Sequence, residues 1–98
     1  MSNLTFTKKA VGDLTQIWKY TYSNWSEIQA DRYYFMLIEN CKEIANNPEV
    51  GKNYSGVTEC LFGFKTGRHI IFYRIINANE VEITRILHER MDLKSRLG

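Results

Sequence analysis

The sequence predicts an α+β fold: a short N-terminal strand and an antiparallel two-helix hairpin pack on an antiparallel β-sheet meander, followed by a short C-terminal tail. Apolar residues recur every three or four positions from Lys8 to Ala45, and every second position from Val57 to His88. The last three segments are separated by breaks of about three residues, which allow only antiparallel neighbours. One helical layer on one sheet buries both amphipathic sets, and residues 1–98 suffice for a single domain.

A strand and a helix are predicted at the start of the chain. Asn3–Thr7 alternates polar and apolar residues, as a half-buried strand does. The Thr7 hydroxyl suits the N-cap of a helix that runs from Lys8 to about Ser23. Residues at spacings of three and four form one face of this helix, which we expect to be buried: Ala10, Leu14, Ile17, Trp18 and Thr21.

The second helix has clear signals at both ends. Ser26 and Gln29 form a capping box, in which the serine hydroxyl accepts from the backbone N–H of Gln29 and the glutamine amide reaches back. Asn46-Asn47-Pro48 ends the helix, because proline interrupts the backbone hydrogen bonds and restricts the residue before it. A turn of about three residues between the two helices predicts that they lie antiparallel.

Three strands are predicted after a loop at Glu49–Gly56: Val57–Phe64, Arg68–Ile76 and Glu80–His88. The middle strand is apolar on both faces. Either both faces are covered within the domain, or one of them awaits a partner. The tail, Glu89–Gly98, is polar and basic.

A three-residue connection between the last two strands fixes their expected register. Arg74 then lies opposite Glu82 as a cross-strand ion pair that contributes about 0.2–1 kcal/mol, and Arg68 lies opposite His88. In this register His69 and His88 point to opposite faces of the sheet and share no metal ion. A shift of one residue would reverse that conclusion.

Composition predicts a cytoplasmic protein without cofactor or metal. Cys41 and Cys60 are too few for a disulfide framework or a zinc site. We find neither a signal peptide nor an apolar run that could span a membrane. The basic residues concentrate at the C-terminal end: Leu61–Gly98 carries seven Lys or Arg against four Asp or Glu. Such a surface can face an acidic partner, although a plain solvated surface fits equally well.

An RNA-cleaving site is the enzymatic alternative. Arginines can hold the oxygens of a scissile phosphate while an imidazole acts as general acid, and the candidates are Arg68, Arg74, Arg85 and His88. The carboxylates that could serve as a base, Glu59 and Glu82, are not brought to this cluster by their spacing. The aromatic residues follow helical or strand spacing, which favours core packing over base stacking, so we expect no direct nucleic-acid binding.

Several segments together resemble one protein family. They are Thr7–Ala10 with Asp13, Leu14, Ile17 and Tyr20, then Ala30 and Tyr33, Ala45–Pro48 with Gly51, and Gly67–Ile75. The most specific segment is Ile83–Asp92, in which Arg-Ile-Leu-His is followed by a closing Asp. In order and spacing the chain resembles the ParE-type toxins of the RelE/ParE superfamily.

The resemblance implies a RelE-like fold and a type II toxin–antitoxin pair. A ParD-like antitoxin would wrap and neutralise the toxin in a hetero-oligomer, and the toxin would poison DNA gyrase without being a catalyst. RelE relatives instead cut messenger RNA on the ribosome and commonly carry a C-terminal aromatic residue. No aromatic residue follows Tyr73 here, which counts against that alternative. A third alternative is a non-toxic protein of this fold that only binds an antitoxin.

The predicted site binds a protein, either the antitoxin or the target. Its residues carry most of the basic charge of the C-terminal third: Arg68, Tyr73, Arg74, Arg85, His88, Arg90 and Asp92. A basic surface there would complement an acidic antitoxin segment and steer its association. No catalytic residue is predicted.

Overall fold

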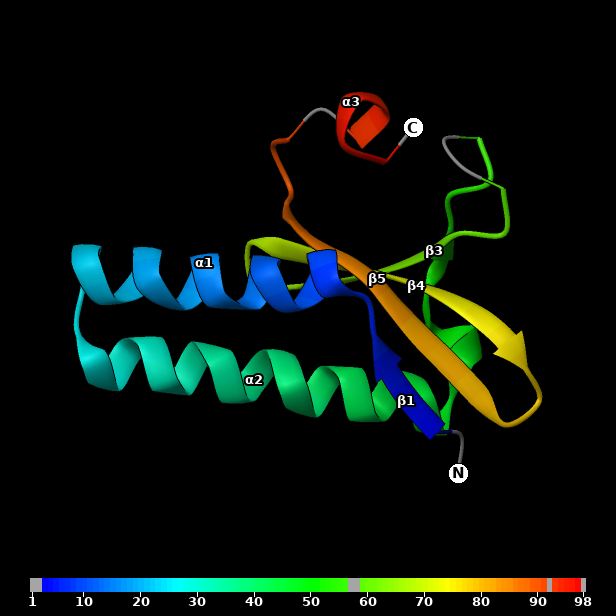
Figure 1. Ribbon diagram of the computed structural model, residues 1–98, viewed down its shortest axis with the longest axis horizontal. Helices are drawn as coiled ribbons and strands as arrows, with labels where there is room; N and C mark the ends of the chain where they lie inside the picture. The colour runs from blue at the N-terminus through cyan, green and yellow to red at the C-terminus, as the bar shows by residue number, and fades with distance from the viewer. Residues whose placement is uncertain (1–2, 57–58, 92, 98) are drawn as a thin grey trace.

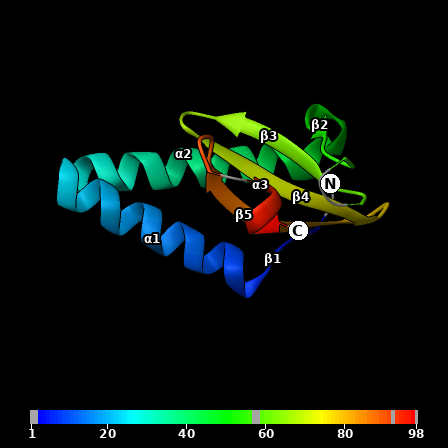
Figure 2. The ribbon, with the colours of Figure 1, turned by 90° about the horizontal axis from the view of Figure 1, so that it is seen from above.

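The computed structural model describes residues 3–56, 59–91 and 93–97. Its elements are β1 (Asn3–Phe6), α1 (Lys8–Asn24), α2 (Glu27–Asn46), the 3₁₀ turn η1 (Pro48–Val50), β2 (Lys52–Asn53), β3 (Phe62–Thr66), β4 (His69–Asn77), β5 (Glu80–His88) and α3 (Leu93–Leu97). The sheet order is β1-β5-β4-β3-β2, with β1 parallel to β5 and the other neighbours antiparallel. Figures 1 and 2 show α1 and α2 side by side along the sheet and projecting past it. The predicted α+β class is confirmed.

The helices begin and end where their capping residues predict. The Thr7 hydroxyl accepts a hydrogen bond from the backbone N–H of Ala10 at 3.0 Å, and Ser26 does the same for Gln29 at 3.0 Å. Each bond satisfies one of the N–H groups that the first turn of a helix leaves unpaired. At the other end, α2 stops at Asn46, two residues before the proline.

Two apolar cores lie on the two faces of the sheet. The larger lies between the helices and the sheet and is built from Ala10, Leu14, Leu37, Cys41, Ile44, Ile71, Tyr73, Val81, Ile83 and Ile86. On the other face, Leu61, Ile70, Phe72 and Leu87 pack with Tyr54, Leu93 and Leu97. The chain itself therefore covers the second face of β4, through the loop before β3 and through α3. This settles which of the two interpretations of the middle strand is right.

The predicted first strand of the meander is displaced. It was expected at Val57–Phe64, but β3 runs from Phe62 to Thr66, and Val57 and Thr58 lie outside the described residues. Cys60 has a φ of 58°, a left-handed conformation that a strand does not tolerate, so the strand starts only after it. The predicted loop contains the short strand β2, which pairs with the start of β3.

The predicted register of β4 and β5 is correct from Tyr73 to Ile75 and wrong on both sides of that stretch. At the turn, Asn77 pairs with Glu80, so the connection has two residues and not the predicted three. Arg74 lies opposite Glu82 as predicted, but His69, not Arg68, lies opposite His88. Between these pairs the ladder shifts by one residue, which leaves Thr84 of β5 without a direct partner, as in a β-bulge. The shift puts His69 and His88 on the same face, with ring centroids 5.4 Å apart. The prediction that they point to opposite faces is therefore wrong.

Candidate functional site

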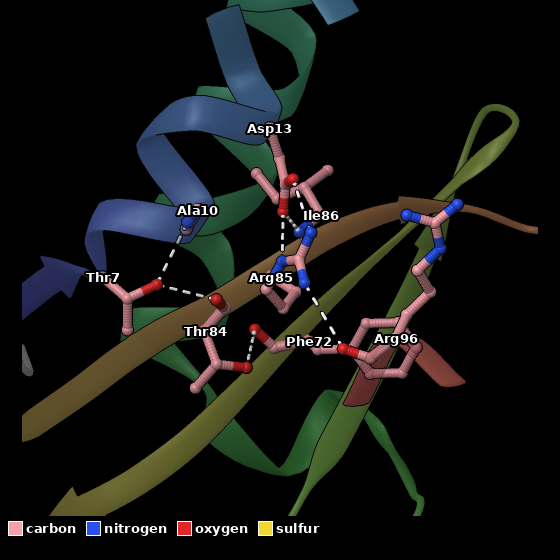
Figure 3. Close-up of polar contacts among 8 residues, drawn as sticks. All are labelled: Thr7, Ala10, Asp13, Phe72, Thr84, Arg85, Ile86 and Arg96. Atoms are coloured by element: carbon pink, nitrogen blue, oxygen red, sulfur yellow. Dashed lines mark hydrogen bonds and ion pairs between the residues drawn. The ribbon is translucent and has the colours of Figure 1, made fainter. Parts of the chain in front are cut away.

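The start of α1 closes the edge of β5 beyond the end of β1. The backbone N–H of Thr7 donates to the carbonyl of Ile83 at 3.0 Å, and the Thr7 hydroxyl donates to the carbonyl of Thr84 at 2.7 Å. Further along, the backbone N–H of Ile86 donates to the Asp13 carboxylate at 2.9 Å (Figure 3). Side chains thus provide the hydrogen bonds that a neighbouring strand would otherwise provide.

The same carboxylate holds Arg85. Nε and Nη2 of Arg85 donate to the two oxygens of Asp13 at 2.8 and 2.9 Å, in the forked geometry that suits a guanidinium and a carboxylate (Figure 3). Only 18% of the Arg85 side chain and 15% of the Asp13 side chain are exposed. The hydrogen bonds that Arg85 donates to Asp13 raise the pKa of Arg85, against the opposing effect of burial. Arg85 is therefore a structural ion-pair partner that joins β5 to α1.

A basic pocket opens beside this ion pair. It has a volume of about 260 Å³ and is lined by Thr7, Lys9, Leu61, Arg74, Glu82, Thr84, Arg85, Arg96 and Leu97. We call it the basic pocket. Arg74 and Glu82 face one another in register, yet the described part of the chain shows no ion pair between them. The Nε atom of Arg74 is inaccessible to solvent and has no hydrogen-bond partner. The predicted cross-strand ion pair is thus not formed.

A larger, mostly apolar groove lies between the helical hairpin and the end of the sheet. Its volume is about 910 Å³, and its lining comes from α1, the α1–α2 turn, α2, the β3–β4 turn and the end of β5: Gln16, Ile17, Tyr20, Thr21, Trp25, Gln29, Tyr33, Gly67, Arg68, His69, His88 and Met91. We call it the hairpin groove. Tyr20 is 68% exposed and Trp25 is 73% exposed. Large apolar side chains this exposed are typical of a surface that binds another protein.

A hydrogen-bonded cluster forms the sheet end of the hairpin groove. The backbone N–H of Arg68 donates to the Tyr33 hydroxyl at 3.1 Å, and the same hydroxyl forms a hydrogen bond with Nδ1 of His69 at 2.6 Å. Nδ1 of His88 accepts from the backbone N–H of Arg90 at 3.2 Å. Burial and the neighbouring His88 lower the pKa of His69 to about 4, so the His69 imidazole is neutral at neutral pH.

The predicted site residues fall into separate places. Arg68 and His88 line the hairpin groove, whereas Arg74 and Arg85 line the basic pocket. Arg90 is exposed beside His88, and Asp92 lies outside the described residues. The seven residues thus do not form one surface.

Tyr73 is a correction to the predicted site, because its side chain is fully buried. Its hydroxyl donates to the carbonyl of Pro48 at 2.6 Å and accepts from the backbone N–H of Gly51 at 2.9 Å. A Cβ at position 51 would lie 2.2 Å from that hydroxyl, so glycine is required for this close approach. Burial also raises the pKa of Tyr73. The residue anchors the loop after α2 and offers no surface to a partner.

Two features of the sites were missed from the sequence. Trp25 was expected in the core, but it sits in the two-residue turn between the helices and faces solvent. Its position after the last turn of the first predicted helix was the available signal. Asp13 was quoted only as part of the resemblance, and its distance of 72 residues from Arg85 gives no local signal of the pair.

Neither a metal site nor a membrane-spanning helix is found in the described ranges. No group of three or more His, Cys, Asp or Glu residues is arranged to hold a metal ion within residues 3–56, 59–91 and 93–97. Over the same ranges, every helix is too short or too polar to cross a membrane.

Comparison with known proteins gives the family. A family model described as the ParE toxin of the type II toxin–antitoxin system parDE matches residues 4–93. This chain belongs to the ParE toxin family. It is 31% identical over 98 residues to the toxin ParE1 of Caulobacter vibrioides, and the match covers 100% of both chains. It is therefore a toxin of the type II toxin–antitoxin class.

Solved structures show the same fold. A chain of the chromosomal ParDE toxin–antitoxin system from P. aeruginosa superposes with a TM-score of 0.76 at 19% identity, covering 90% of this chain and 96% of that one. A chain of the toxin–antitoxin complex RelBE2 from Mycobacterium tuberculosis has a TM-score of 0.70 at 22% identity, covering 90% and 98%. At these identities the likeness establishes the RelE-like fold that the resemblance implied.

Proposed function

We propose that this ParE-family toxin poisons DNA gyrase by binding it in the cytoplasm, without catalysis, and that a ParD-like antitoxin neutralises it. The observation that carries the proposal is the separation of the residues that a nuclease would need. Arg68 and His88 belong to the hairpin groove, and Arg74 and Arg85 belong to the basic pocket. A general acid has to reach the same phosphate that the arginines hold. These four residues do not surround one position.

The state of each side chain also speaks against RNA cleavage. Asp13 already occupies the guanidinium fork of Arg85. Nδ1 of His88 accepts a hydrogen bond from the backbone N–H of Arg90, so only its other ring nitrogen is left to face a substrate. The described residues that line the basic pocket include no aromatic side chain on which a base could stack. A protein-binding mode of action fits these facts better than hydrolysis does.

The hairpin groove is the proposed antitoxin site. An amphipathic helix docks by placing apolar side chains at helical spacing into an apolar groove. Tyr20, Trp25 and Met91 supply exposed apolar surface for such contacts. Arg68 at the groove and the exposed Arg90 beside it supply positive charge for acidic residues that flank the apolar face of the helix.

A plasmid assay tests the mode of action. Purified gyrase, ATP, supercoiled plasmid and the toxin are incubated and then treated with detergent and protease, which expose any trapped double-strand break. We expect linear plasmid to accumulate with the toxin and to disappear when the ParD-like antitoxin is added first. A toxin that arrests growth but yields no linear plasmid would refute gyrase poisoning. Cleavage of ribosome-bound messenger RNA by that preparation would establish the nuclease alternative.

A further inference from the structure

Arg74 is an unusual residue in this fold because part of its guanidinium is buried without a partner. It projects from β4 into the lining of the basic pocket, and its Nε atom is closed to solvent and lacks an acceptor. Nearly all buried polar groups in proteins are hydrogen-bonded, so such an exception calls for a physical explanation. The cross-strand neighbour Glu82 lies directly opposite but does not supply the missing acceptor.

The charges around the basic pocket leave an excess of positive charge. Asp13 neutralises Arg85, which also donates through Nη1 to the backbone carbonyl of Arg96 at 3.4 Å (Figure 3). Among the remaining residues of the lining, Lys9, Arg74 and Arg96 are positive and Glu82 is negative. An added carboxylate would offset part of this excess and provide the acceptor that Arg74 lacks.

The lining favours an isolated carboxylate over a nucleotide. Its described residues are aliphatic, hydroxyl-bearing or charged, with no aromatic ring to stack on a base. The volume of the basic pocket is about 260 Å³, far smaller than the 910 Å³ of the hairpin groove, so it suits a single side chain better than a helix. Arginine binds carboxylates through two parallel N–H donors, and the Nε–H is one of the donors it uses.

We propose that the basic pocket receives the carboxylate of one Asp or Glu of the antitoxin, held by Arg74. This inference rests on the proposed antitoxin partner and gives that partner a second contact, distinct from the hairpin groove. The Nε–H of Arg74 is closed to solvent, so the guanidinium has to turn toward the pocket as the acidic side chain enters, and it then exchanges an unpaired buried N–H for a forked hydrogen bond. The basic pocket thus acts as an anchor for a segment of the antitoxin that continues past the helix bound in the hairpin groove.

The first measurement follows the Nε–H of Arg74 directly. Arginine Nε–H signals of the full-length toxin are recorded by NMR during separate titrations with acetate and with inorganic phosphate. We expect acetate to shift the Arg74 signal saturably, with the signal of Arg32, an exposed arginine on α2, as the internal control. No response of Arg74 to acetate overturns the proposal. A response to phosphate at lower concentration than to acetate also overturns it, in favour of a phosphate site.

The second measurement uses the complex. Calorimetry compares antitoxin binding by the wild type, Arg74→Gln, Arg74→Lys and the matched control Arg32→Gln, after circular dichroism confirms that each is folded. Losing one partner of a desolvated charge pair should weaken binding about 30-fold or more for Arg74→Gln. Arg74→Lys keeps the charge but loses the fork and should fall between, while Arg32→Gln binds as the wild type does. If the wild type binds the antitoxin and Arg74→Gln binds it equally well, this inference is overturned and the proposed function still stands. If the wild type does not bind the antitoxin, the proposed partner itself is wrong.

Discussion

Replacing Asp13 by alanine removes three hydrogen bonds at once. Nε and Nη2 of Arg85 lose their carboxylate, and the backbone N–H of Ile86 loses the carboxylate oxygen that it contacts at the open edge of β5. The guanidinium is then left mostly buried and unpaired, because only 18% of the Arg85 side chain is exposed. The ion pair links β5 to α1, so its loss affects the contact between the two layers of the fold.

The magnitude follows from this burial. Removing one partner of a buried ion pair costs about 3–5 kcal/mol. The partial exposure of this pair lowers that to about 2–4 kcal/mol, because solvent can reach the remaining charge. A domain of this size loses about 4–8 °C of melting temperature per kcal/mol, so Asp13→Ala should melt at least about 8 °C below the wild type. The net stability of such a domain is about 5–15 kcal/mol, so the variant should still fold at low temperature.

Thermal and urea unfolding followed by circular dichroism measure the effect. The matched control is Glu39→Ala, because Glu39 pairs with Lys42 on the surface, where the two side chains are 69% and 60% exposed. That pair should contribute no more than about 0.5 kcal/mol. The double variant Asp13→Ala with Arg85→Ala should recover part of the loss, because no unpaired charge remains. If Asp13→Ala unfolded with the same midpoint as Glu39→Ala, the structural role given to this ion pair would be refuted.

The ion pair between Asp13 and Arg85 also affects the interpretation of experiments in which an arginine of the predicted site is replaced by glutamate. Arg85→Glu would place a second carboxylate against Asp13, so a loss of toxicity would report unfolding as much as lost binding. Arg90→Glu avoids this problem because Arg90 is exposed and, among the described residues, its contact with His88 is made by its backbone N–H. Arg90 is therefore the better position at which to test the predicted partner-binding surface.

Three further predictions follow from the groove, the histidine cluster and Tyr73. Trp25→Ala should leave the unfolding midpoint within about 0.5 kcal/mol but weaken antitoxin binding at least about tenfold by calorimetry; equal effects from Phe35→Ala, which is 63% exposed on α2 outside the hairpin groove, would contradict a specific site. The pKa of His69 is about 4 in the folded protein and 6.5 in the unfolded chain, so the unfolded chain binds the proton first as the pH falls. The free energy of unfolding should therefore decrease from pH 7 to pH 4, by at most about 3 kcal/mol from this group. Urea titrations at these pH values should show that difference between wild type and His69→Gln, and identical pH profiles would refute it. Tyr73→Phe should cost about 1–2 kcal/mol in unfolding free energy and leave toxicity per folded molecule unchanged, whereas reduced toxicity without destabilisation would restore its predicted binding role.

Local signals in the sequence predicted the helical half of the fold accurately. Thr7 and Ser26 cap the two helices through hydrogen bonds to the third residue after each, and Pro48 ends the second. These interactions depend on residues a few positions apart, so the sequence contains all the information they need. The period-two segments likewise predicted β4 and β5 to within one residue. The resemblance to ParE toxins was confirmed by the family match over residues 4–93.

The sites depended on contacts between distant parts of the chain. Thr84 bulges out of the ladder while its carbonyl accepts from Thr7, 77 residues away, and that bulge places His69 beside His88. No local pattern predicts a register shift that is associated with packing against another element. The start of β3 is also set by tertiary structure. Cys60 has a φ of 58° because it lies in the loop that covers the second core, and the strand begins only after it.

The sequence by itself thus determined the two long helices, the strands β1, β4 and β5, the α+β class and the family, because periodicity, capping and short turns act over a few residues. Only the tertiary structure decided which basic residues act together. It paired Arg85 with Asp13, left Arg74 facing a pocket, and set Arg68 and His88 in a different groove. The sequence does not show where a charged side chain points. The chemistry of that side chain depends on the burial and the partners that packing gives it.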